Sequence, residues 1–262
     1  MWISKTKNLK LNKILLTGST GFLGTYIKKN FIFKKKLIFN DSEDFTSVIH
    51  LAAINKFPEY NLNKSRSSKI NYDLFKNTIK KKNLIDTYIF ASTIDCGKKN
   101  YPKFKKEYVD CKKKIENELY KLYKLKFIKK VYILRLPFIS RFDKSNFLVN
   151  IIEKLNSKNN LTISKTSLNY NSITSREDIN KFINCVFFKK KKTFLKLNFC
   201  SNKTCNLEKV IKIIKKKSKN YSKLVFKDKS YNKGISSIKL MKFPFVHNKP
   251  EKIILNLSKK KF

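Results

Sequence analysis

Three of the five glycines in this 262-residue sequence fall within seven residues, at Gly18, Gly21 and Gly24. They form a GxxGxxG pattern in the string KILLTGSTGFLG, where an apolar run of strand length leads into a helical segment. The first glycine of such a turn permits a tight bend, the second lets the backbone approach a pyrophosphate, and the third lets the helix pack closely on the strand. A helix that begins at Phe22 and Leu23 also directs N–H groups and the positive end of its dipole toward phosphates. The turn therefore predicts a dinucleotide site made by these five residues, the alternative being an ordinary strand–helix turn.

The elements around this turn alternate between short apolar runs and longer stretches of helical period, which predicts an α/β fold with a parallel sheet. The expected strands are 13–17, 37–39, 48–51, 87–91, 131–136, 194–199 and, more weakly, 223–226. The expected helices are 22–30, 66–82, 105–124, 147–155, 176–188 and 207–217. Apart from the weak strand, the chain beyond about residue 221 is interpreted as a Lys-rich tail.

The formal charge of +43 first suggests a nucleic-acid partner, because Lys and Arg neutralise phosphates. Only four of the 61 basic residues are arginine, and proteins that recognise bases or phosphates favour the bidentate arginine side chain. Lysine is abundant together with Asn, Ile, Phe and Tyr, the residues of A- and T-rich codons, and it is dispersed along the chain. We therefore expect a solvated basic surface that attracts anionic ligands, and no specific nucleic acid.

Several broad classes are excluded by composition. At 41% hydrophobic residues the chain can bury a core, which argues against intrinsic disorder. No apolar run approaches bilayer length, and MWISKTKNLKLNK lacks the apolar segment of a secretory signal, so neither a membrane partner nor secretion is expected. The cysteines form no CxxC pair, which argues against zinc and against a disulfide framework and favours a reducing cytoplasm; they are Cys96, Cys111, Cys185, Cys200 and Cys205.

The Thr-Gly start and the GxxGxxG spacing resemble the short-chain dehydrogenase/reductase superfamily, and best its extended branch, the NAD-dependent epimerase/dehydratase family. Further segments over roughly residues 13–190 follow in the family's order. VIHLAA resembles the strand whose end, here Leu51, Ala52 and Ala53, lies beside the adenine and its ribose. ILRLPF resembles the strand whose end, at Pro137, contacts the nicotinamide. The resemblance implies a Rossmann-type doubly wound parallel sheet with a small C-terminal substrate-binding part.

Other residues fit the resemblance without carrying chemistry. Asn71 in INYDLFKNTI resembles the Asn of the helix after the VIHLAA strand, and Asp178 in ITSREDI resembles an Asp characteristic of a later segment. His50 stands in mid-strand among apolar residues. We expect it to be structural, with a hydrogen bond to neighbouring backbone.

The family uses a catalytic Tyr with a Lys four residues later, on the helix after the Ser/Thr strand. Five tyrosines have a Lys at that spacing: Tyr60, Tyr72, Tyr101, Tyr108 and Tyr120. Position on the expected helix and a small residue before the Lys favour Tyr108 and Lys112, with Glu116 four residues further on, as in many relatives. The alternative is a solvent-facing pair on a basic helix.

The chemistry implied for this pair is acid–base catalysis. Residues four apart lie on one helix face, where an ammonium favours the phenolate form of the Tyr. The phenolate then takes a hydroxyl proton as hydride leaves the same carbon for the cofactor. Lys112 would also hold the nicotinamide ribose. The third member is Thr93 by the match of YIFAST and Ser92 by counting back from Gly97, and both stay open.

The cofactor is expected to be NAD or NADP. Asp41 lies 23 residues after Gly18, near the spacing of an acidic residue on the ribose 2′-hydroxyl, which favours NAD. Lys34, Lys35 and Lys36 instead offer charge to a 2′-phosphate. Residues 39–48 leave less than the dozen or so residues that a parallel crossover normally needs, so the second strand is either unusual or followed by a bare connection.

We therefore predict an NAD(P)-dependent oxidoreductase or epimerase that acts on a nucleotide sugar by Tyr-assisted hydride transfer. The expected domains are an N-terminal extension (1–12), an NAD(P)-binding domain (13–190) and a small substrate-binding part with the Lys-rich tail (191–262). No metal is expected, the location is cytoplasmic, and a homodimer stays open. The alternatives are a member of the same fold that binds RNA and one that is a non-catalytic scaffold.

Overall fold

The computed structural model divides the chain into two compact units. Unit 1 comprises residues 1–135 and 180–197, and unit 2 comprises residues 136–179 and 198–262. Residues 136–179 thus pack with unit 2, whereas the expected functional boundary at residue 190 stays a prediction. The structure describes residues 13–40, 43–54, 62–79, 84–98, 101, 103–140, 147–157, 160–167, 170–218, 223–230 and 247–259.

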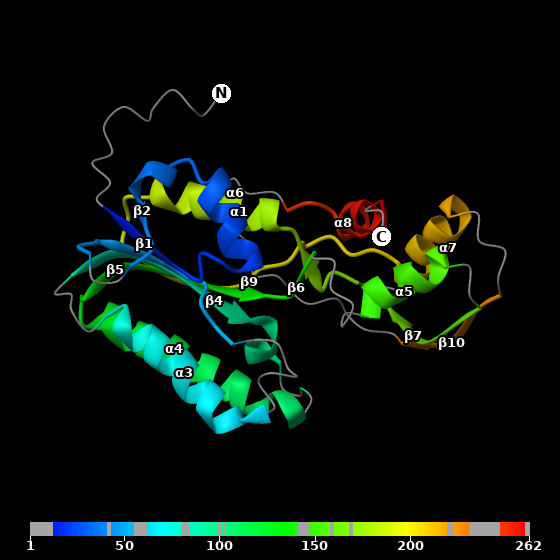
Figure 1. Ribbon diagram of the computed structural model, residues 1–262, viewed down its shortest axis with the longest axis horizontal. Coiled ribbons are helices and arrows are strands. Elements are labelled where there is room, and N and C mark those ends of the chain that lie inside the picture. The colour runs from blue at the N-terminus through cyan, green and yellow to red at the C-terminus, as the bar shows by residue number, and fades with distance from the viewer. Residues whose placement is uncertain are drawn as a thin grey trace. The chain divides into compact units, whose positions relative to one another are not determined.

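Unit 1 is built on a six-stranded parallel sheet with the order β2-β1-β3-β4-β5-β9, which confirms the expected Rossmann-type class (Figure 1). The central strands are continuous apolar runs because helices cover both faces of the sheet. Ile14 pairs with Leu37 on one side and with Ser47 on the other. The strands are β1 (Ile14–Thr17), β2 (Leu37–Ile38), β3 (Ser47–His50), β4 (Ile85–Thr93), β5 (Ile128–Leu136) and β9 (Thr193–Asn198).

The second strand is unusual, and its connection is bare, as the short spacing predicted. β2 has two residues, and residues 39–46 alone join it to β3. Leu37, the first residue of β2, and Ser47, the first residue of β3, are both paired with Ile14 of β1. The connection therefore has to return along the length of the two-residue strand β2 and cross β1, which lies between β2 and β3. That is why fewer than the usual dozen or so residues suffice for this parallel crossover.

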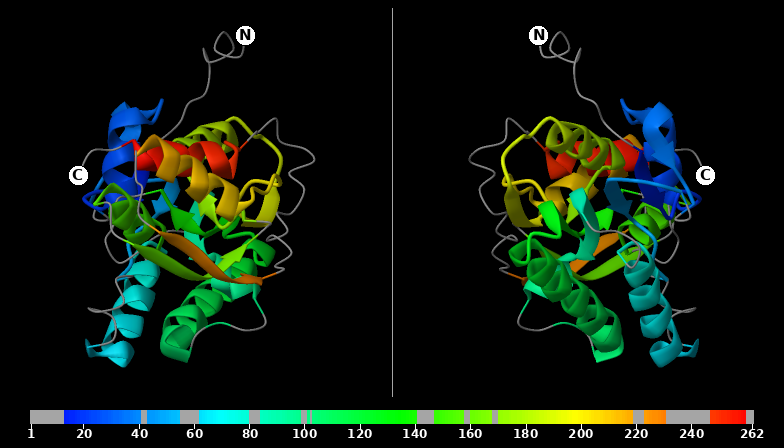
Figure 2. Two further views of the ribbon diagram at one scale, coloured as in Figure 1. Left: turned by 90° about the vertical axis from the view of Figure 1, so that its right-hand side faces the viewer. Right: turned by 90° about the vertical axis from the view of Figure 1, so that its left-hand side faces the viewer.

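Helices cover the two faces of the sheet. In Figure 1, α1 (Phe22–Asn30) and α6 (Arg176–Phe187) lie on one face, and α3 (Lys64–Asn77) and α4 (Lys106–Lys124) lie on the other. Figure 2 shows α3 and α4 together on their side of the sheet. The core beneath them contains buried side chains from both strands and helices, among them Val48, Phe75, Tyr88, Ile115 and Val131.

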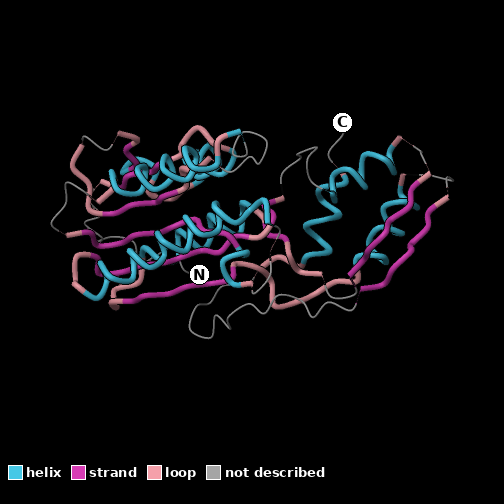
Figure 3. Tube along the Cα trace, turned by 90° about the horizontal axis from the view of Figure 1, so that it is seen from below, coloured by secondary structure: helices cyan, strands magenta, loops and turns pink. Residues whose placement is uncertain are grey.

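Unit 2 has its own core. Two short parallel pairs, β6 (Phe138–Ile139) with β8 (Ile173–Thr174) and β7 (Leu161–Ser167) with β10 (Leu224–Ser230), provide its strands. Figure 3 shows β7 and β10 running side by side. The buried apolar residues come mainly from β7 and three helices, which are α5 (Phe147–Asn156), α7 (Leu207–Lys217) and α8 (Pro250–Ser258).

Most expected elements are confirmed, and the interpretation of the C-terminal stretch as a tail is wrong. α8 begins with Pro250 at its first turn and buries Ile253, Ile254 and Leu257, so the stretch contributes a core helix. The strands β6, β7 and β8 were not predicted. In the described part of the chain, no helix is long and apolar enough to cross a membrane.

Candidate active site

The glycine turn joins the carboxyl end of β1 to α1. Gly18 has a φ of 70°, and a Cβ there would stand 2.7 Å from the backbone nitrogen of Ala52, so the turn needs glycine for both reasons. A Cβ at Gly24 would overlap the carbonyl of Gly18, which allows α1 to pack directly on the turn. These two positions agree with the roles expected of the first and third glycines.

Gly21 is different, because the protein around it leaves room. A Cβ there would meet one atom within 4 Å, the carbonyl oxygen of Gly18 at 3.3 Å. Gly21 also precedes α1 without a side-chain cap, and no acidic residue occupies the first helical turn. Open space before an uncapped, uncharged helix start fits a phosphate group.

The next strand end is held beside this turn by two side chains. The Thr17 hydroxyl oxygen accepts the N–H groups of Leu51 and Ala52, each at 3.2 Å. Asn71 of α3 accepts the Ile54 N–H at 2.7 Å and donates to the Ile54 carbonyl at 3.1 Å. The predicted segment that includes Ala53 is therefore fixed between β1 and α3. Sequence reasoning missed Thr17, although its place directly before Gly18 was the available signal.

His50 is structural, as expected, but its partner is a side chain. Its Nδ1 lies 3.2 Å from the Thr17 hydroxyl, and the ring packs among Phe75, Tyr88 and Phe90. Burial, together with the positive charge of Lys112, lowers the pKa of His50 to about 3. His50 is therefore neutral near pH 7.

Tyr108 and Lys112 lie on one face of α4. The Lys112 ammonium is buried, and its Nζ donates to the Ala91 carbonyl at 2.9 Å. It stands 4.6 Å from the centre of the Phe90 ring and 5.7 Å from the centre of the half-buried Tyr108 ring. Burial lowers the pKa of Lys112 to about 8, against the opposing influence of Glu116 and two cysteines. A cation is thus held under one side of the phenol ring.

The other tyrosines with the same spacing lack this arrangement. Among the described residues, the corresponding lysines Lys76, Lys105 and Lys124 are all partly or fully exposed. The Tyr101 hydroxyl donates to Asp110 at 3.4 Å, and Tyr120 is itself exposed. Tyr60 lies outside the described residues. Burial of the lysine therefore distinguishes the Tyr108 pair.

Ser92 and Thr93 point in opposite directions at the end of β4, since successive side chains of a strand alternate. The Ser92 hydroxyl is buried and donates to Glu116 Oε1 at 2.6 Å. Thr93 is half-buried, and its hydroxyl oxygen accepts the Asp95 N–H at 3.4 Å as a weak cap on the following turn. The Ser92 hydroxyl is thus engaged inside the unit, which favours Thr93 as the hydroxyl that meets a ligand.

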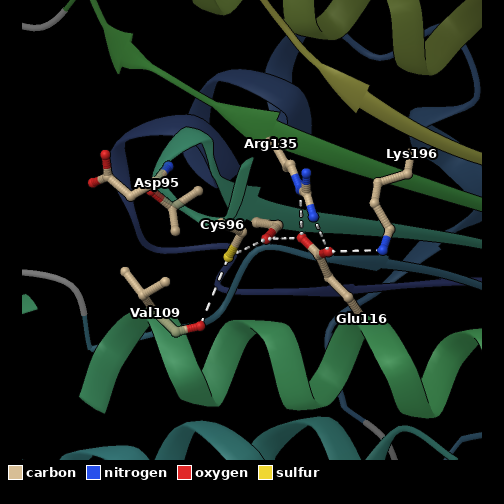
Figure 4. A network of polar contacts seen from close by, with 8 residues as sticks. Asp95, Cys96, Val109, Glu116, Arg135 and Lys196 are labelled. Atoms are coloured by element: carbon tan, nitrogen blue, oxygen red, sulfur yellow. Dashed lines mark hydrogen bonds and ion pairs between the residues drawn. The ribbon is translucent and has the colours of Figure 1, made fainter. Parts of the chain in front are cut away.

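Glu116 is the centre of a buried ionic network that sequence reasoning did not anticipate (Figure 4). Its carboxylate accepts from Arg135 at 3.0 and 2.7 Å, and Lys196 Nζ lies 3.1 Å away. Burial alone would raise the pKa of Glu116, but Arg135, Ser92 and Lys196 together hold it below its usual value. The network ties α4 to β4, β5 and β9. Its only sequence signal was the position of Glu116 four residues after Lys112.

Three further residues singled out in the sequence are Asp41, Pro137 and Asp178. Asp41 lies outside the described residues. Pro137 directly follows β5, at the carboxyl end where it was expected. Asp178 is fully buried in unit 2, where it accepts the backbone N–H and the side-chain amide of Asn248 at 3.1 and 2.8 Å. No group of residues suited to a metal ion occurs in the described ranges.

Comparisons with solved structures identify the fold. A UDP-N-acetylglucosamine 4-epimerase from Methanobrevibacter ruminantium M1, in complex with UDP-N-acetylmuramic acid, matches 96% of this chain and 98% of its own at 16% identity and a TM-score of 0.72. The chain has the fold of the extended short-chain dehydrogenases/reductases. RMD from Pseudomonas aeruginosa, complexed with NADPH, matches 95% of this chain and 98% of its own at 12% identity and a TM-score of 0.70.

A third structure of this fold is UDP-glucuronic acid 4-epimerase from Bacillus cereus, in complex with UDP-glucuronic acid and NAD. It matches 84% of this chain and 90% of its own at 15% identity and a TM-score of 0.63. No family model matches the sequence, and a comparison with curated proteins found no match. The resemblance stated from the motifs is thus confirmed at the level of the fold.

Proposed function

We propose that this protein is an NAD(P)-dependent oxidoreductase or epimerase that acts on a nucleotide sugar, with Tyr108 as the acid–base group. The observation that carries the proposal is the buried Lys112 ammonium beside the half-buried Tyr108 ring. Burying a lysine costs free energy, and no other tyrosine of this spacing in the described ranges has a buried lysine. Neighbours of the same fold were solved with nucleotide sugars and with NAD or NADPH, which supports the substrate and cofactor classes.

The glycine turn fits the cofactor's pyrophosphate. The backbone of Gly18, Gly21, Phe22, Leu23 and Gly24 would surround it at the start of α1, and the space that a Cβ at Gly21 would fill would be taken by phosphate oxygens.

The adenosine end is expected at the strand ends beside the turn. Leu51, Ala52 and Ala53 would lie along it, and Asp41 stays the proposed partner of the ribose. Lys34–Lys36 precede β2 and therefore stand at its amino end, away from the carboxyl ends of the strands, which favours NAD over NADP.

At the reacting centre, the cofactor would supply a hydride acceptor and donor. Thr93 would orient the substrate hydroxyl, with Ser92 kept on Glu116. Tyr108 would take the hydroxyl proton as the carbon gives up its hydride, and would return a proton when the carbonyl is reduced. Lys112 would favour the phenolate and hold the nicotinamide ribose, and Pro137 would border the nicotinamide.

The test replaces the proposed proton acceptor and two matched tyrosines. A thermal-shift panel of NAD, NADP and nucleotide sugars first finds a ligand, because ligands of the native state raise its melting temperature. Tyr108→Phe keeps the ring and should lower kcat by roughly 10²- to 10⁴-fold while cofactor binding survives. Lys112→Met should lower kcat and weaken cofactor binding as well.

Tyr101→Phe and Tyr120→Phe are the controls and should stay within a few-fold of the native rate. If Tyr101→Phe abolishes turnover and Tyr108→Phe does not, the site is misplaced on the helix. If none of the three variants lowers turnover, the proposed oxidoreductase mechanism is wrong. If the native chain binds NAD but turns over no nucleotide sugar, it is the non-catalytic member of the fold that the sequence also allowed.

A further inference from the structure

The end of the sheet where the strands begin gathers four connections that are distant in sequence. In a parallel sheet, every helix-to-strand connection returns to this end, opposite the glycine turn. We call it the amino edge and define it as residues 31–36 before β2, Leu84 before β4, 125–127 before β5 and 188–192 before β9. It lies at the left of the sheet in Figure 1.

Contacts join these connections into one surface. The Ile32 N–H donates to Asn184 at 3.2 Å, and the Phe33 ring packs 5.5 Å from that of Phe188. Lys130 Nζ donates to the Lys189 carbonyl at 3.1 Å. Lys130 Nζ also forms an ion pair with Asp86 at 2.8 Å. Next to Asp86, the Ile85 N–H donates to the Phe127 carbonyl at 2.8 Å. The amino edge is therefore continuous from the connection before β2 to the one before β9.

Large apolar side chains on this edge face solvent. Their exposed fractions run from 37% for Phe188 to 67% for Leu125, with the others between these values; the five are Ile32, Leu84, Leu125, Phe127 and Phe188. Single exposed apolar residues are ordinary, but several on one joined surface indicate a site of interaction.

The same connections are strongly basic. Exposed lysines of these connections stand on either side of the apolar residues: Lys34, Lys35, Lys36, Lys126, Lys190, Lys191 and Lys192. Lys124, the last residue of α4, is exposed directly beside them. Among the described residues, the acidic ones near the edge are Glu43, Asp44 and Asp86. Glu43 is paired with Lys13, and Asp86 with Lys130. The described arginines lie elsewhere, at α3 (Arg66), β5 (Arg135) and α6 (Arg176).

We propose that the amino edge docks on a membrane surface containing anionic phospholipid. Apolar side chains enter the headgroup region while lysine stems lie along it with their ammonium groups on lipid phosphates. Nucleic acid fits less well, because Ile32, Leu84 and Leu125 cannot stack on bases and the edge carries no described arginine. The expectation of no membrane partner rested on the lack of a spanning segment, which peripheral docking does not need.

The test is flotation of the full chain with vesicles at physiological salt. We expect binding to phosphatidylcholine vesicles that contain phosphatidylserine and little binding to phosphatidylcholine alone. The apolar variant combines Ile32→Ser, Leu125→Ser, Phe127→Ser and Phe188→Ser, and it should lose at least tenfold in affinity. The matched control removes exposed apolar side chains away from the edge, by Leu62→Ser, Ile70→Ser and Ile213→Ser, and it should bind as the native chain does. Circular dichroism checks that both variants fold.

A second pair of variants separates position from net charge. Each variant removes three positive charges. The first replaces Lys34–Lys36 by Ser, and the second replaces Lys215–Lys217 of α7 by Ser. About 1 kcal/mol per lysine near the surface predicts roughly a hundredfold loss for the first and little change for the second. Equal losses, or an apolar variant that binds as the native chain does, would show a nonspecific charge effect and overturn the proposal. It also fails if polyuridylate, rather than vesicles, loses affinity selectively in the edge variants, because the edge would then bind RNA.

Discussion

Breaking the carboxylate at the centre of the Glu116 network should destabilise the protein strongly. Glu116→Gln keeps the shape of the side chain and removes its charge, which leaves Arg135 and Lys196 without their counter-ion. The Glu116 side chain is 1% exposed and accepts four hydrogen bonds or ion pairs at 2.6–3.1 Å. Removing one partner of such a buried pair costs about 3–5 kcal/mol. That is a large part of the roughly 5–15 kcal/mol by which a native protein is stable.

The assay is urea unfolding followed by circular dichroism. The midpoint should fall by about 1 M or more, given the usual dependence of unfolding free energy on urea. Glu118→Gln, on the same helix, is the control, because Glu118 pairs with Lys121 at 3.4 Å where both are solvent-accessible. Exposed pairs contribute about 0–1 kcal/mol, so the control should stay within that range.

A rescue variant distinguishes the ion pair from simple loss of packing. Glu116→Leu combined with Arg135→Met and Lys196→Met removes every charge, and it should recover much of the lost stability because apolar replacements of buried ion pairs are often neutral. The contribution of the Glu116 carboxylate to the free energy of unfolding should also be lost in acid. Its pKa is lower in the folded state, so this contribution is fully present above the unfolded pKa and is lost as pH falls through the folded pKa. If Glu116→Gln costs no more than Glu118→Gln, the network does not hold the strands as argued.

Two further predictions concern the glycine turn and the buried histidine. Gly21→Val should fold, because a Cβ there meets only the Gly18 carbonyl oxygen at 3.3 Å, but should lose NAD binding in calorimetry; undiminished affinity would place the cofactor elsewhere. His50 should make the protein acid-sensitive: its folded pKa of about 3 lies below the unfolded value of 6.5, so its contribution is present above pH 6.5 and falls with pH by up to about 1.4 kcal/mol per unit. His247, whose pKa burial lowers to about 4, should add a similar dependence. In urea titrations between pH 6.5 and 5, His50→Phe should therefore roughly halve the total change of unfolding free energy with pH; an unchanged dependence would contradict the assignment to His50.

Local patterns determined a large part of this fold. The first residues of α1 and α7 follow from short-range signals, namely the glycine turn before Phe22 and the Asn206 side chain that accepts the Lys209 N–H. Tyr108 and Lys112 lie on one face of their helix because they are four residues apart, which the sequence spacing alone determines. The short β2–β3 connection was also visible, because it depends only on counting residues between two apolar runs.

Other features depended on partners far away in the chain, and only the tertiary structure decided them. Spacing alone made Tyr101, Tyr108 and Tyr120 equivalent, and the resemblance favoured Tyr108 by the small residue before its Lys. The structure adds that Lys112 is buried against Ala91 and Phe90 of β4. Ser92 and Thr93 are adjacent in the sequence, which left both hydroxyls open. The tertiary structure shows that the Ser92 hydroxyl is hydrogen-bonded to Glu116 of α4.

The C-terminal helix was missed for the same reason. A segment such as α8, with short apolar runs between charges, becomes a stable helix only when a core formed by α7 and β7 covers its apolar face. Likewise, the amino edge collects residues 31–36 and 188–192 because parallel strands bring all their beginnings to one end. Sequence spacing specifies each segment, whereas the long-range packing of the sheet determines which segments become neighbours.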